Sequence, residues 1–315
     1  MSGKRVDTAI WSLIAVAASG TALWMSAAGL TFDWTSAALP VLACLGLSAL
    51  ASFYCHRRPD ARIAVTLTGM AQLIAFSMVG ATLSYAVASM GRPLWDDTLY
   101  RWDQAIGLDW RAYLAFVDAR PALGLVYTVA YRSIELQIIV TVTVLGFGGA
   151  ARRLRAFVLA FILAGITVIL ISSAMPAMAM YVHLGLRPRD FSHLAPAAAY
   201  VHVADLSGLR DGTLRVISLA RAEGIITFPS FHAALGVIFA LALWAVRLLR
   251  WPGLALNLTM IAATPIDGGH YFVDLIAGGA LGVLAFGVAR AISRRSIVGI
   301  RPLIPRAIEG ARVEV

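Results

Sequence analysis

The sequence predicts an all-α fold, a polytopic membrane helix bundle of about eight transmembrane helices. Of its 315 residues, 60% are hydrophobic and 14% are charged, and the mean hydropathy is +0.79. One globular core of this length cannot bury so much apolar surface. Apolar runs long enough to cross a hydrocarbon layer of about 30 Å recur along the chain, with basic residues in the short connections.

Three apolar runs begin the chain. The first, from about Ala9 to Phe32, is longer than the core of a typical signal peptide, and no small-residue cleavage site stands out after it. We therefore expect it to be retained as a first span. The second run covers about residues 36–55 and the third about 63–90, and each is long enough to cross a bilayer.

The segment 91–120 is rich in both aspartate and aromatic residues. Such a mixture favours an interfacial segment, with aromatic rings at the level of the lipid headgroups. An ordinary solvated loop helix explains the same composition equally well. The residues concerned are Asp96, Asp97, Asp103, Asp109 and Asp118, with Trp95, Tyr100, Trp102, Trp110 and Tyr113.

The fourth apolar run, about residues 122–148, contains two charged residues, Arg132 and Glu135. Because they are i,i+3 neighbours on a helix, they can neutralise each other near the middle of the membrane. Such a pair, facing the bundle, is a candidate for part of a lipid-headgroup or acceptor pocket. A purely structural ion pair is the alternative.

The fifth apolar run follows a basic turn and ends near Tyr181, and the longest polar connection, about 183–226, comes next. Loops of this length in compact proteins are usually functional or mobile. We expect this one to cap the site and to supply phosphate ligands, although a solvated charge is the alternative for each residue. The candidate cations are Arg187, Arg210 and Arg221.

Three further runs complete the predicted bundle. The sixth begins at Pro229, and the seventh, about residues 252–265, is short. The eighth begins at His270 and carries Gly278 and Gly282, a spacing that permits close packing against another helix.

Polar residues gather at the beginnings of the sixth and eighth helices. Pro229 followed by Ser230 is a helix-start signal, and the free amides of such a turn form a site for an anionic oxygen. His232 falls in that turn. His270 and Asp274 are spaced i,i+4, so the carboxylate can fix the tautomer of the imidazole. One histidine can then act as a nucleophile or base while the other protonates a leaving group.

Each of these residues has a plainer structural explanation when it is taken alone. Ser230 is more often only a helix cap, at roughly two to one, and His270 can simply satisfy a helix end. Asp274 is harder to explain in this way, because a carboxylate inside a membrane helix is costly without a partner. The combination is therefore more specific than its members.

The two polar clusters carry a family resemblance. Pro229-Ser230-Phe231-His232, followed about forty residues later by His270-x-x-x-Asp274, resembles the second and third signature motifs of the type 2 phosphatidic acid phosphatase superfamily. The longer segment from Gly224 to Ala234 is most similar to the sequence of the branch that contains inositol phosphorylceramide synthases.

The resemblance implies a role for each of these residues. His270 would attack phosphorus to form a phosphohistidine, Asp274 would orient it, and His232 would protonate the departing oxygen. Ser230 and Phe231 would contact the substrate, as we also expect of Arg187, Arg132 and Glu135. It further implies a six-helix phosphatidic acid phosphatase-like core over residues 63–296, with extracytoplasmic loops 91–120 and 183–226. Residues 1–62 would then add two transmembrane helices, and residues 297–315 a cytoplasmic tail.

Two departures from the family pattern concern phosphate-binding cations. The Ser-Arg pair that precedes the third-motif histidine is replaced by Ala263 and Thr264. Arg187-Pro188 stands in the order of the first motif, but the lysine position before it is Met180. Loss of these cations weakens the phosphatidate phosphatase interpretation and favours a phosphodiester donor, whose phosphate carries less charge.

The distribution of positive charge predicts the orientation. With eight spans, 16 Lys and Arg residues fall on the side of both termini, mostly in short connections, and nine fall on the other side in longer loops. The short basic loops are therefore expected in the cytoplasm. His232 and His270 then emerge on one extracytoplasmic face, periplasmic in a bacterial inner membrane. The net charge of +9 thus indicates orientation rather than nucleic-acid binding.

The sequence favours a membrane enzyme that breaks the phosphoester of a lipid phosphate substrate. Whether water or a lipid or sugar alcohol accepts the phosphoryl group is left open, as is the oligomeric state. No residue pattern requires a metal or an organic cofactor. The alternatives are a polyprenyl diphosphate or phosphatidate phosphatase, and a transporter or lipid-binding protein without chemistry.

Overall fold

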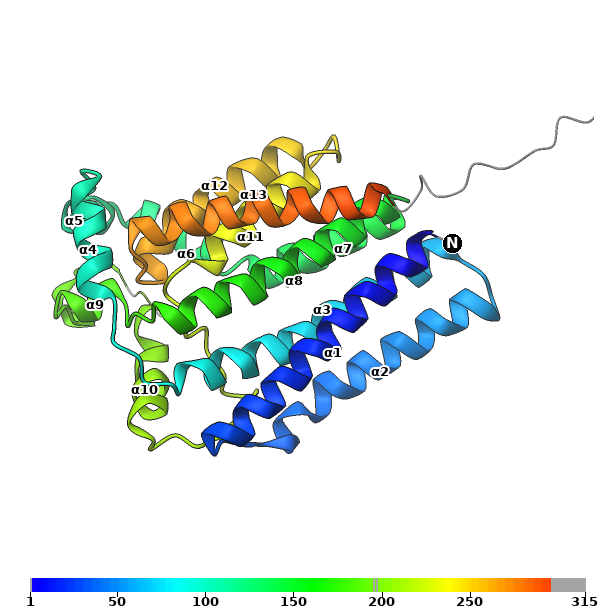
Figure 1. The fold of residues 1–315 in the computed structure, drawn as a ribbon. Coiled ribbons are helices and arrows are strands. Elements are labelled where there is room, and N and C mark those ends of the chain that lie inside the picture. Colours follow the sequence, from blue (N-terminus) through cyan, green and yellow to red (C-terminus); the bar gives the residue numbers. More distant parts are fainter. Residues whose placement is uncertain (1, 195, 197, 296–315) are drawn as a thin grey trace, which may run out of the picture.

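The computed structural model of the chain describes residues 2–194, 196 and 198–295. Within this part the fold is helical, with thirteen α-helices and one pair of two-residue strands. The long helices run alongside one another (Figure 1). Three short helices gather at one end of the bundle, α4 (Asp96–Ala105), α5 (Trp110–Asp118) and α9 (Met180–His183). The prediction of an all-α, polytopic bundle is confirmed.

Five helices among the described residues are long and apolar enough to cross a membrane by themselves. They are α1 (Ser2–Ala28), α2 (Trp34–His56), α3 (Ala61–Ala88), α8 (Ala151–Ala174) and α13 (Phe272–Arg295). A sixth span is formed only if α6 (Pro121–Tyr131) and α7 (Ile134–Phe147) are taken together. The eight spans predicted from hydropathy are therefore too many by this criterion.

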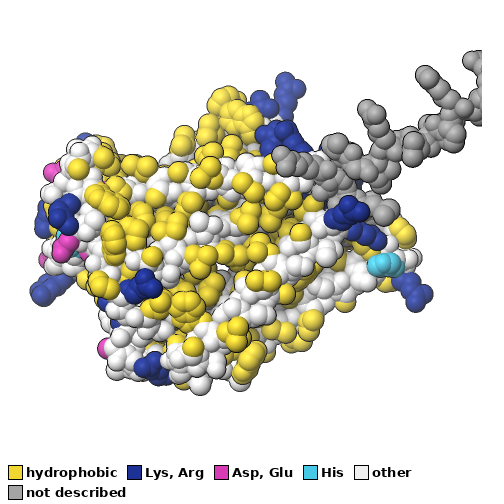
Figure 2. All heavy atoms as spheres, in the orientation of Figure 1, with side chains coloured by type: hydrophobic (Ala, Val, Ile, Leu, Met, Phe, Trp, Pro, Cys, Tyr) yellow, Lys and Arg dark blue, Asp and Glu magenta, His cyan; other side chains and the backbone are white. Residues whose placement is uncertain are grey.

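The predicted sixth and seventh spans correspond to α11 (Phe231–Leu243) and α12 (Arg250–Asp267). α11 has 13 residues, which at about 1.5 Å per residue make a helix of roughly 20 Å, shorter than a hydrocarbon layer. Both helices nevertheless lie in the bundle beside α13 (Figure 1). Hydrophobic side chains cover the flank of the bundle and charged ones gather toward its ends (Figure 2), as expected for a protein surrounded by lipid.

The predicted fourth span is broken rather than continuous. α6 ends at Tyr131, α7 begins at Ile134, and the two are bent by 50°. Arg132 lies in the break, so the regular helical spacing to Glu135 is lost. Both side chains are exposed, and no ion pair joins them in the described structure. The predicted mid-membrane ion pair is therefore wrong.

The fifth span ends earlier than predicted, at Ala174 rather than near Tyr181. Pro176 follows one residue after the C-cap Met175, and proline cannot continue a helix because it lacks an amide donor. The long connection after α9 is also partly regular. It holds a 3-10 turn (Pro188–Asp190), α10 (Ala198–Asp211) and β2 (Val216–Ile217), which pairs in parallel with β1 (Thr31–Phe32).

α13 packs closely against α11, as the spacing of Gly278 and Gly282 predicted. A Cβ atom at Gly278 would collide with the carbonyl oxygen of Ser230, and one at Gly282 would lie 2.5 Å from the carbonyl oxygen of Ala234. Only glycine permits this approach. The two helices therefore begin side by side.

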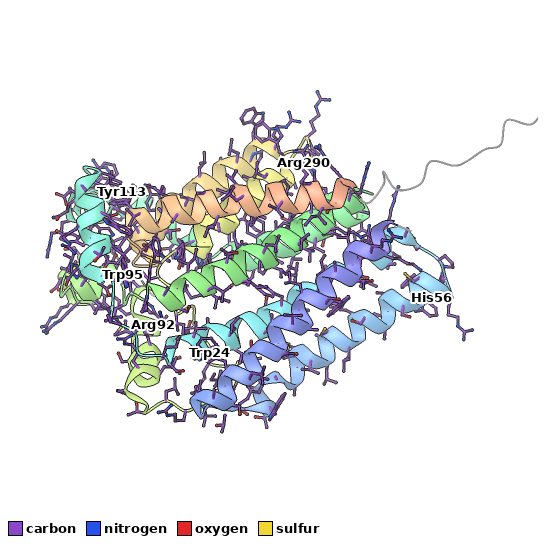
Figure 3. The ribbon with its side chains drawn as sticks, in the orientation of Figure 1. Trp24, His56, Arg92, Trp95, Tyr113 and Arg290 are labelled. Carbon is purple, nitrogen blue, oxygen red and sulfur yellow. The ribbon has the colours of Figure 1, made fainter. Side chains whose placement is uncertain are left out.

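The aspartate-rich segment 91–120 folds over one end of the bundle as α4 and α5. Trp110 is buried, and its ring meets that of Tyr181 edge to face with centroids 4.8 Å apart. Figure 3 shows Trp95 and Tyr113 at this end and His56 and Arg290 at the other. The segment is thus a packed cover for the bundle end rather than a solvated loop.

Candidate active site

Ser230 caps the first turn of α11. Its Oγ accepts a hydrogen bond of 3.2 Å from the backbone amide of Ala233, and the helix begins at Phe231. The predicted start at Pro229 is therefore two residues early, because the capping serine itself takes an extended conformation. The Ser230 side chain is buried and is not among the described residues that line the cavity of His232 and His270. Its hydroxyl proton remains available for donation.

His270 precedes α13 rather than forming its first turn, since the helix begins at Phe272. The predicted contact to Asp274 is nevertheless formed, with 3.1 Å between His270 Nδ1 and Asp274 Oδ2. The same carboxylate oxygen accepts a hydrogen bond of 2.8 Å from the backbone amide of Tyr271. Asp274 is fully buried. The carboxylate therefore holds Nδ1 of His270, and the imidazole also has the backbone of Thr227 within hydrogen-bonding reach.

His232 and His270 line one cavity of about 430 Å³. The ring of His232 stacks on that of Tyr131, with centroids 4.2 Å apart and an angle of 6° between the planes. Phe231 also lines this cavity, which we call the histidine cavity. The structure thus brings together His232, His270 and Asp274. The contact of Tyr131 with His232 had no signal in the sequence, because it depends on the end of α6 meeting the first turn of α11.

The histidine cavity has an apolar wall and a polar end. The apolar wall comes from α3 and α8, with Phe76, Phe161 and Ile169 among its residues. The polar end includes Glu135 and Glu223. Among the described lining residues there is no lysine or arginine. A lipid tail suits the first region and a hydroxyl-bearing group the second.

Arg132 lines a smaller cavity of about 180 Å³ beside the histidine cavity. The two cavities share Tyr131 and Glu223 among their lining residues. Arg132 is therefore the arginine that borders the site. None of the three predicted loop cations lines the histidine cavity. Arg187 and Arg221 are exposed, and Arg210 donates to the carbonyl oxygen of Arg92 (2.7 Å).

The long connection contributes to the site through other residues. His202 lines the histidine cavity, and its Nε2 lies 2.6 Å from the carbonyl oxygen of Met178. Thr227 Oγ1 donates a hydrogen bond of 2.9 Å to the carbonyl oxygen of Ala177. The connection therefore covers the cavity, as predicted, but without supplying cations. Its histidines stand out in the sequence, yet nothing there indicates which of them turns inward.

Three residues of the segment 91–120 hold the chain around His270. Asp103 accepts hydrogen bonds from the backbone amides of Phe272 (2.9 Å) and Val273 (2.8 Å), the first residues of α13. The indole of Trp110 donates to the carbonyl oxygen of His270 (3.1 Å). Burial raises the pKa of Asp103, and the two amide donors oppose that rise.

Asp96 is the third residue of this group. It accepts a hydrogen bond of 2.8 Å from the hydroxyl of Tyr271 and one of 3.0 Å from the amide of Met178. The density of aspartates was visible in the sequence, but their long-range partners were not. These contacts make α4 and α5 part of the framework of the site.

Burial also sets the charge of His270. It lowers the pKa of the imidazole to about 4. The ring is therefore neutral near pH 7 and carries a lone pair on one nitrogen. A neutral, oriented imidazole is suited to attack an electrophilic phosphorus atom.

The sequence model of the PAP2 superfamily matches residues 97–288, which is more than half of the chain. The chain belongs to the PAP2 superfamily. No curated protein and no solved structure gives a significant match. The match contains both histidine clusters and supports a phosphatase- or phosphotransferase-type function, as members of the PAP2 superfamily are phosphoesterases or phosphotransferases.

Proposed function

We propose that the chain is an integral-membrane lipid phosphotransferase or phosphatase that works through a phosphohistidine at His270. The observation that carries this proposal is that His232 and His270 line the same cavity while Asp274 holds Nδ1 of His270. A phosphate placed between the two rings would meet a nucleophile on one side and a proton donor on the other.

The reaction would proceed in two displacements. Nε2 of His270 attacks phosphorus, the bond to the leaving oxygen breaks, and His232, in its protonated form, gives its proton to that oxygen. His232 then takes the proton of an acceptor hydroxyl, whose oxygen attacks the phosphohistidine and releases His270. Asp274 accepts the hydrogen bond from Nδ1 throughout and stabilises the charge on the ring.

Charge in the histidine cavity favours a phosphodiester donor and a hydroxylated acceptor. Glu135 and Glu223 line the cavity, and carboxylates repel a doubly charged phosphate monoester more than a singly charged diester. Carboxylate oxygens also accept hydrogen bonds from hydroxyl groups. We therefore favour transfer of a phosphate headgroup to a lipid or sugar alcohol, as in the inositol phosphorylceramide synthases that the sequence resembles.

Arg132 supports an alternative donor. If its side chain turned from the smaller cavity toward the histidines, a more highly charged substrate could be bound. A polyprenyl diphosphate or phosphatidate phosphatase would then be favoured. The lack of a cation among the described lining residues is, conversely, what favours a lipid-binding or transport protein without chemistry.

We further propose that the histidine cavity faces the extracytoplasmic side of a bacterial inner membrane. Its support is the basic end of the bundle opposite α4 and α5, where Arg290 lies (Figure 3). The phosphatidic acid phosphatase-like core would begin after the first two helices, near residue 63. The predicted cytoplasmic tail, 297–315, lies outside the described residues.

The decisive experiment measures product and protein labelling together. Purified protein is incubated with a radiolabelled phosphodiester lipid, with and without hydroxylated acceptors. An acid-labile label on the protein indicates the phosphohistidine. A new phosphodiester as product indicates a transferase, and free phosphate a hydrolase.

Two variants complete this test. His270→Ala should abolish both the label and turnover. His56→Ala, which removes an exposed histidine at the other end of the bundle, should change neither. Full activity in the His270→Ala protein would refute the mechanism, and the absence of any label or product from the unaltered protein would favour the non-catalytic alternative.

A further inference from the structure

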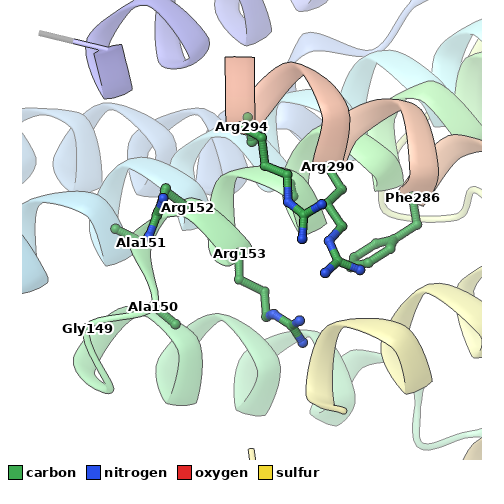
Figure 4. Close-up of a pocket in the computed structure, with 10 residues that line it drawn as sticks. Gly149, Ala150, Ala151, Arg152, Arg153, Phe286, Arg290 and Arg294 are labelled. Atoms are coloured by element: carbon green, nitrogen blue, oxygen red, sulfur yellow. The ribbon is translucent and has the colours of Figure 1, made fainter. Parts of the chain in front are cut away.

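A second cavity, of about 440 Å³, lies at the end of the bundle opposite α4 and α5, between the beginning of α8 and the end of α13. Four arginines line it, namely Arg152, Arg153, Arg290 and Arg294. Figure 4 shows the side chains of Arg153, Arg290 and Arg294 extending toward one space. We call it the arginine cavity.

Among the described residues, no carboxylate balances the positive charge of the arginine cavity. None of its lining residues is acidic, and none of its four arginines forms an ion pair with another described residue. Arg155, close by in the same helix, does pair, with its Nε 2.8 Å from Asp7 Oδ1. Within the described structure, the four guanidinium groups of the arginine cavity therefore lack the carboxylate partner that Arg155 has at the same end of the molecule.

Arg153 is held in place by the protein. Its Nη1 donates hydrogen bonds to the carbonyl oxygens of Leu241 (3.3 Å) and Ala242 (3.1 Å), near the end of α11. These two acceptors occupy one nitrogen and leave the remaining donors of the planar guanidinium for a ligand. The group is thus positioned without being neutralised.

Ser293 provides a second, independent indication of a ligand. The residue lines the arginine cavity and is only 6% exposed, and its Oγ has no hydrogen-bond partner in the described structure. Hydroxyls on helices commonly bond to the carbonyl oxygen four residues earlier, as Thr264 does here with Met260 (2.8 Å). A buried hydroxyl without a partner is costly, so a bound acceptor would satisfy it.

The beginning of α8 adds a third element. The helix has 24 residues and starts at Ala151, and the preceding Ala150 offers no side-chain cap. Ala150 and Ala151 both line the arginine cavity. The positive end of the helix dipole therefore lies at the same cavity as the guanidinium groups.

The combination points to a tetrahedral oxyanion. Guanidinium forks, a hydroxyl donor and a helix N-terminus are the groups that bind phosphate in proteins. Phe286 lines the cavity beside them and offers an apolar surface. Basic cavities between membrane helices suit the headgroups of acidic phospholipids.

We propose that the arginine cavity binds a phosphate group, supplied by an anionic phospholipid in the leaflet away from the histidine cavity or by a soluble phosphate compound. The site is separate from the histidine cavity, so the proposal does not depend on the proposed function. A lipid bound there would hold α8 against α13.

The test uses the full-length protein in phosphatidylcholine nanodiscs, with and without phosphatidylglycerol. Native mass spectrometry after detergent exchange measures how many lipid molecules stay bound. In a second arm, inorganic phosphate is added to protein in neutral detergent against chloride at equal ionic strength, and the unfolding temperature is recorded. The first arm detects a lipid headgroup and the second a free phosphate.

The variants separate the cavity from general surface charge. Arg290→Gln with Arg294→Gln should reduce retention of phosphatidylglycerol about tenfold, because charge-assisted hydrogen bonds are lost. Arg57→Gln with Arg58→Gln removes two exposed positive charges near His56, at the same end of the bundle, and should leave retention unchanged. Ser293→Ala, a small change that should leave the fold intact, is expected to weaken retention about threefold through loss of one hydrogen bond.

Each outcome decides the proposal. Selective retention of phosphatidylglycerol, lost in the Arg290→Gln/Arg294→Gln protein only, supports a lipid site. A rise in unfolding temperature with inorganic phosphate, lost in the same variant and without lipid retention, supports a soluble phosphate compound. Equal effects of the two double variants, no binding in either arm, or unchanged binding by Ser293→Ala would overturn it.

Discussion

The backbone amide of Ser230 donates a hydrogen bond of 3.0 Å to the backbone carbonyl oxygen of Asp274. This bond joins the cap of α11 to the first turn of α13. It brings together two polar clusters that lie about forty residues apart in the sequence. Close packing at Gly278 makes it possible, because no side chain separates the two backbones.

Replacing Gly278 by alanine should therefore damage both stability and the site. A Cβ atom there would collide with the carbonyl oxygen of Ser230, and such overpacking typically costs about 1–3 kcal/mol. Alanine recovers only about 1 kcal/mol through its better helix propensity. We expect a lower unfolding temperature in detergent and reduced phosphoryl transfer. Gly279→Ala is the matched control, since its Cβ would lie 3.9 Å from Val237, and equal behaviour of the two variants would contradict the argument.

Removing the carboxylate of Asp103 should weaken the beginning of α13. Asp103→Leu leaves the half-buried amides of Phe272 and Val273 without acceptors, at an expected cost of about 1–3 kcal/mol for an unsatisfied group. Asp103→Asn keeps one carbonyl oxygen and should cost less. Chemical denaturation and activity assays should show the highest stability and activity in the unaltered protein, lower values in Asp103→Asn and the lowest in Asp103→Leu. Asp97→Asn should match the unaltered protein, because the Asp97 side chain is 88% exposed and its contact with His183 Nδ1, at 3.6 Å, is screened by solvent. An Asp103→Leu variant as stable as this control would show that the bonds of Asp103 are unimportant.

The rate of phosphohistidine formation should be maintained in mildly acidic solution. Burial lowers the pKa of His270 to about 4, below the usual value of 6.5. Because only the neutral ring of His270 has a lone pair, while His232 must carry a proton for the leaving oxygen, formation should not fall as the pH drops from 7 to 5 and should decline near pH 4. Rapid-quench measurement of the rate at which the protein label forms, as a function of pH, would reveal this decline at low pH. A decline centred at or above pH 6.5 would show that burial does not control the nucleophile.

Neutralising the cavity carboxylates should change the choice of substrate. Glu135→Gln and Glu223→Gln each remove a negative charge near the phosphate position. Both residues are exposed and therefore screened, so we expect turnover of a phosphate monoester relative to a diester to rise only about threefold to tenfold. Transfer to a hydroxylated acceptor should fall in parallel. A competition assay with both donors measures the ratio of monoester to diester turnover. An unchanged ratio in both variants would show that these carboxylates do not take part in substrate recognition.

Local features of the fold could be predicted from the sequence. Apolar runs predicted the long helices, and Gly278 with Gly282 predicted the close contact of α13. The predicted starts of α11 and α13 were each two residues early, because a capping residue such as Ser230 is extended rather than helical. The break after Tyr131 was missed because the apolar stretches on its two sides read as one span in hydropathy, and the charges of Arg132 and Glu135 were interpreted as an ion pair within that span.

The sequence by itself determined that this chain forms membrane-crossing helices and that serine, histidine and aspartate stand where two of its apolar helices begin. These properties depend on residues that are neighbours along the chain. Only the tertiary structure decided that His232 stacks on Tyr131, that Asp103 holds the start of α13, and that Arg187 lies away from the histidine cavity. The physical reason is distance along the chain. Asp103 and Phe272 are 169 residues apart, and no local pattern specifies a partner that only packing brings within reach.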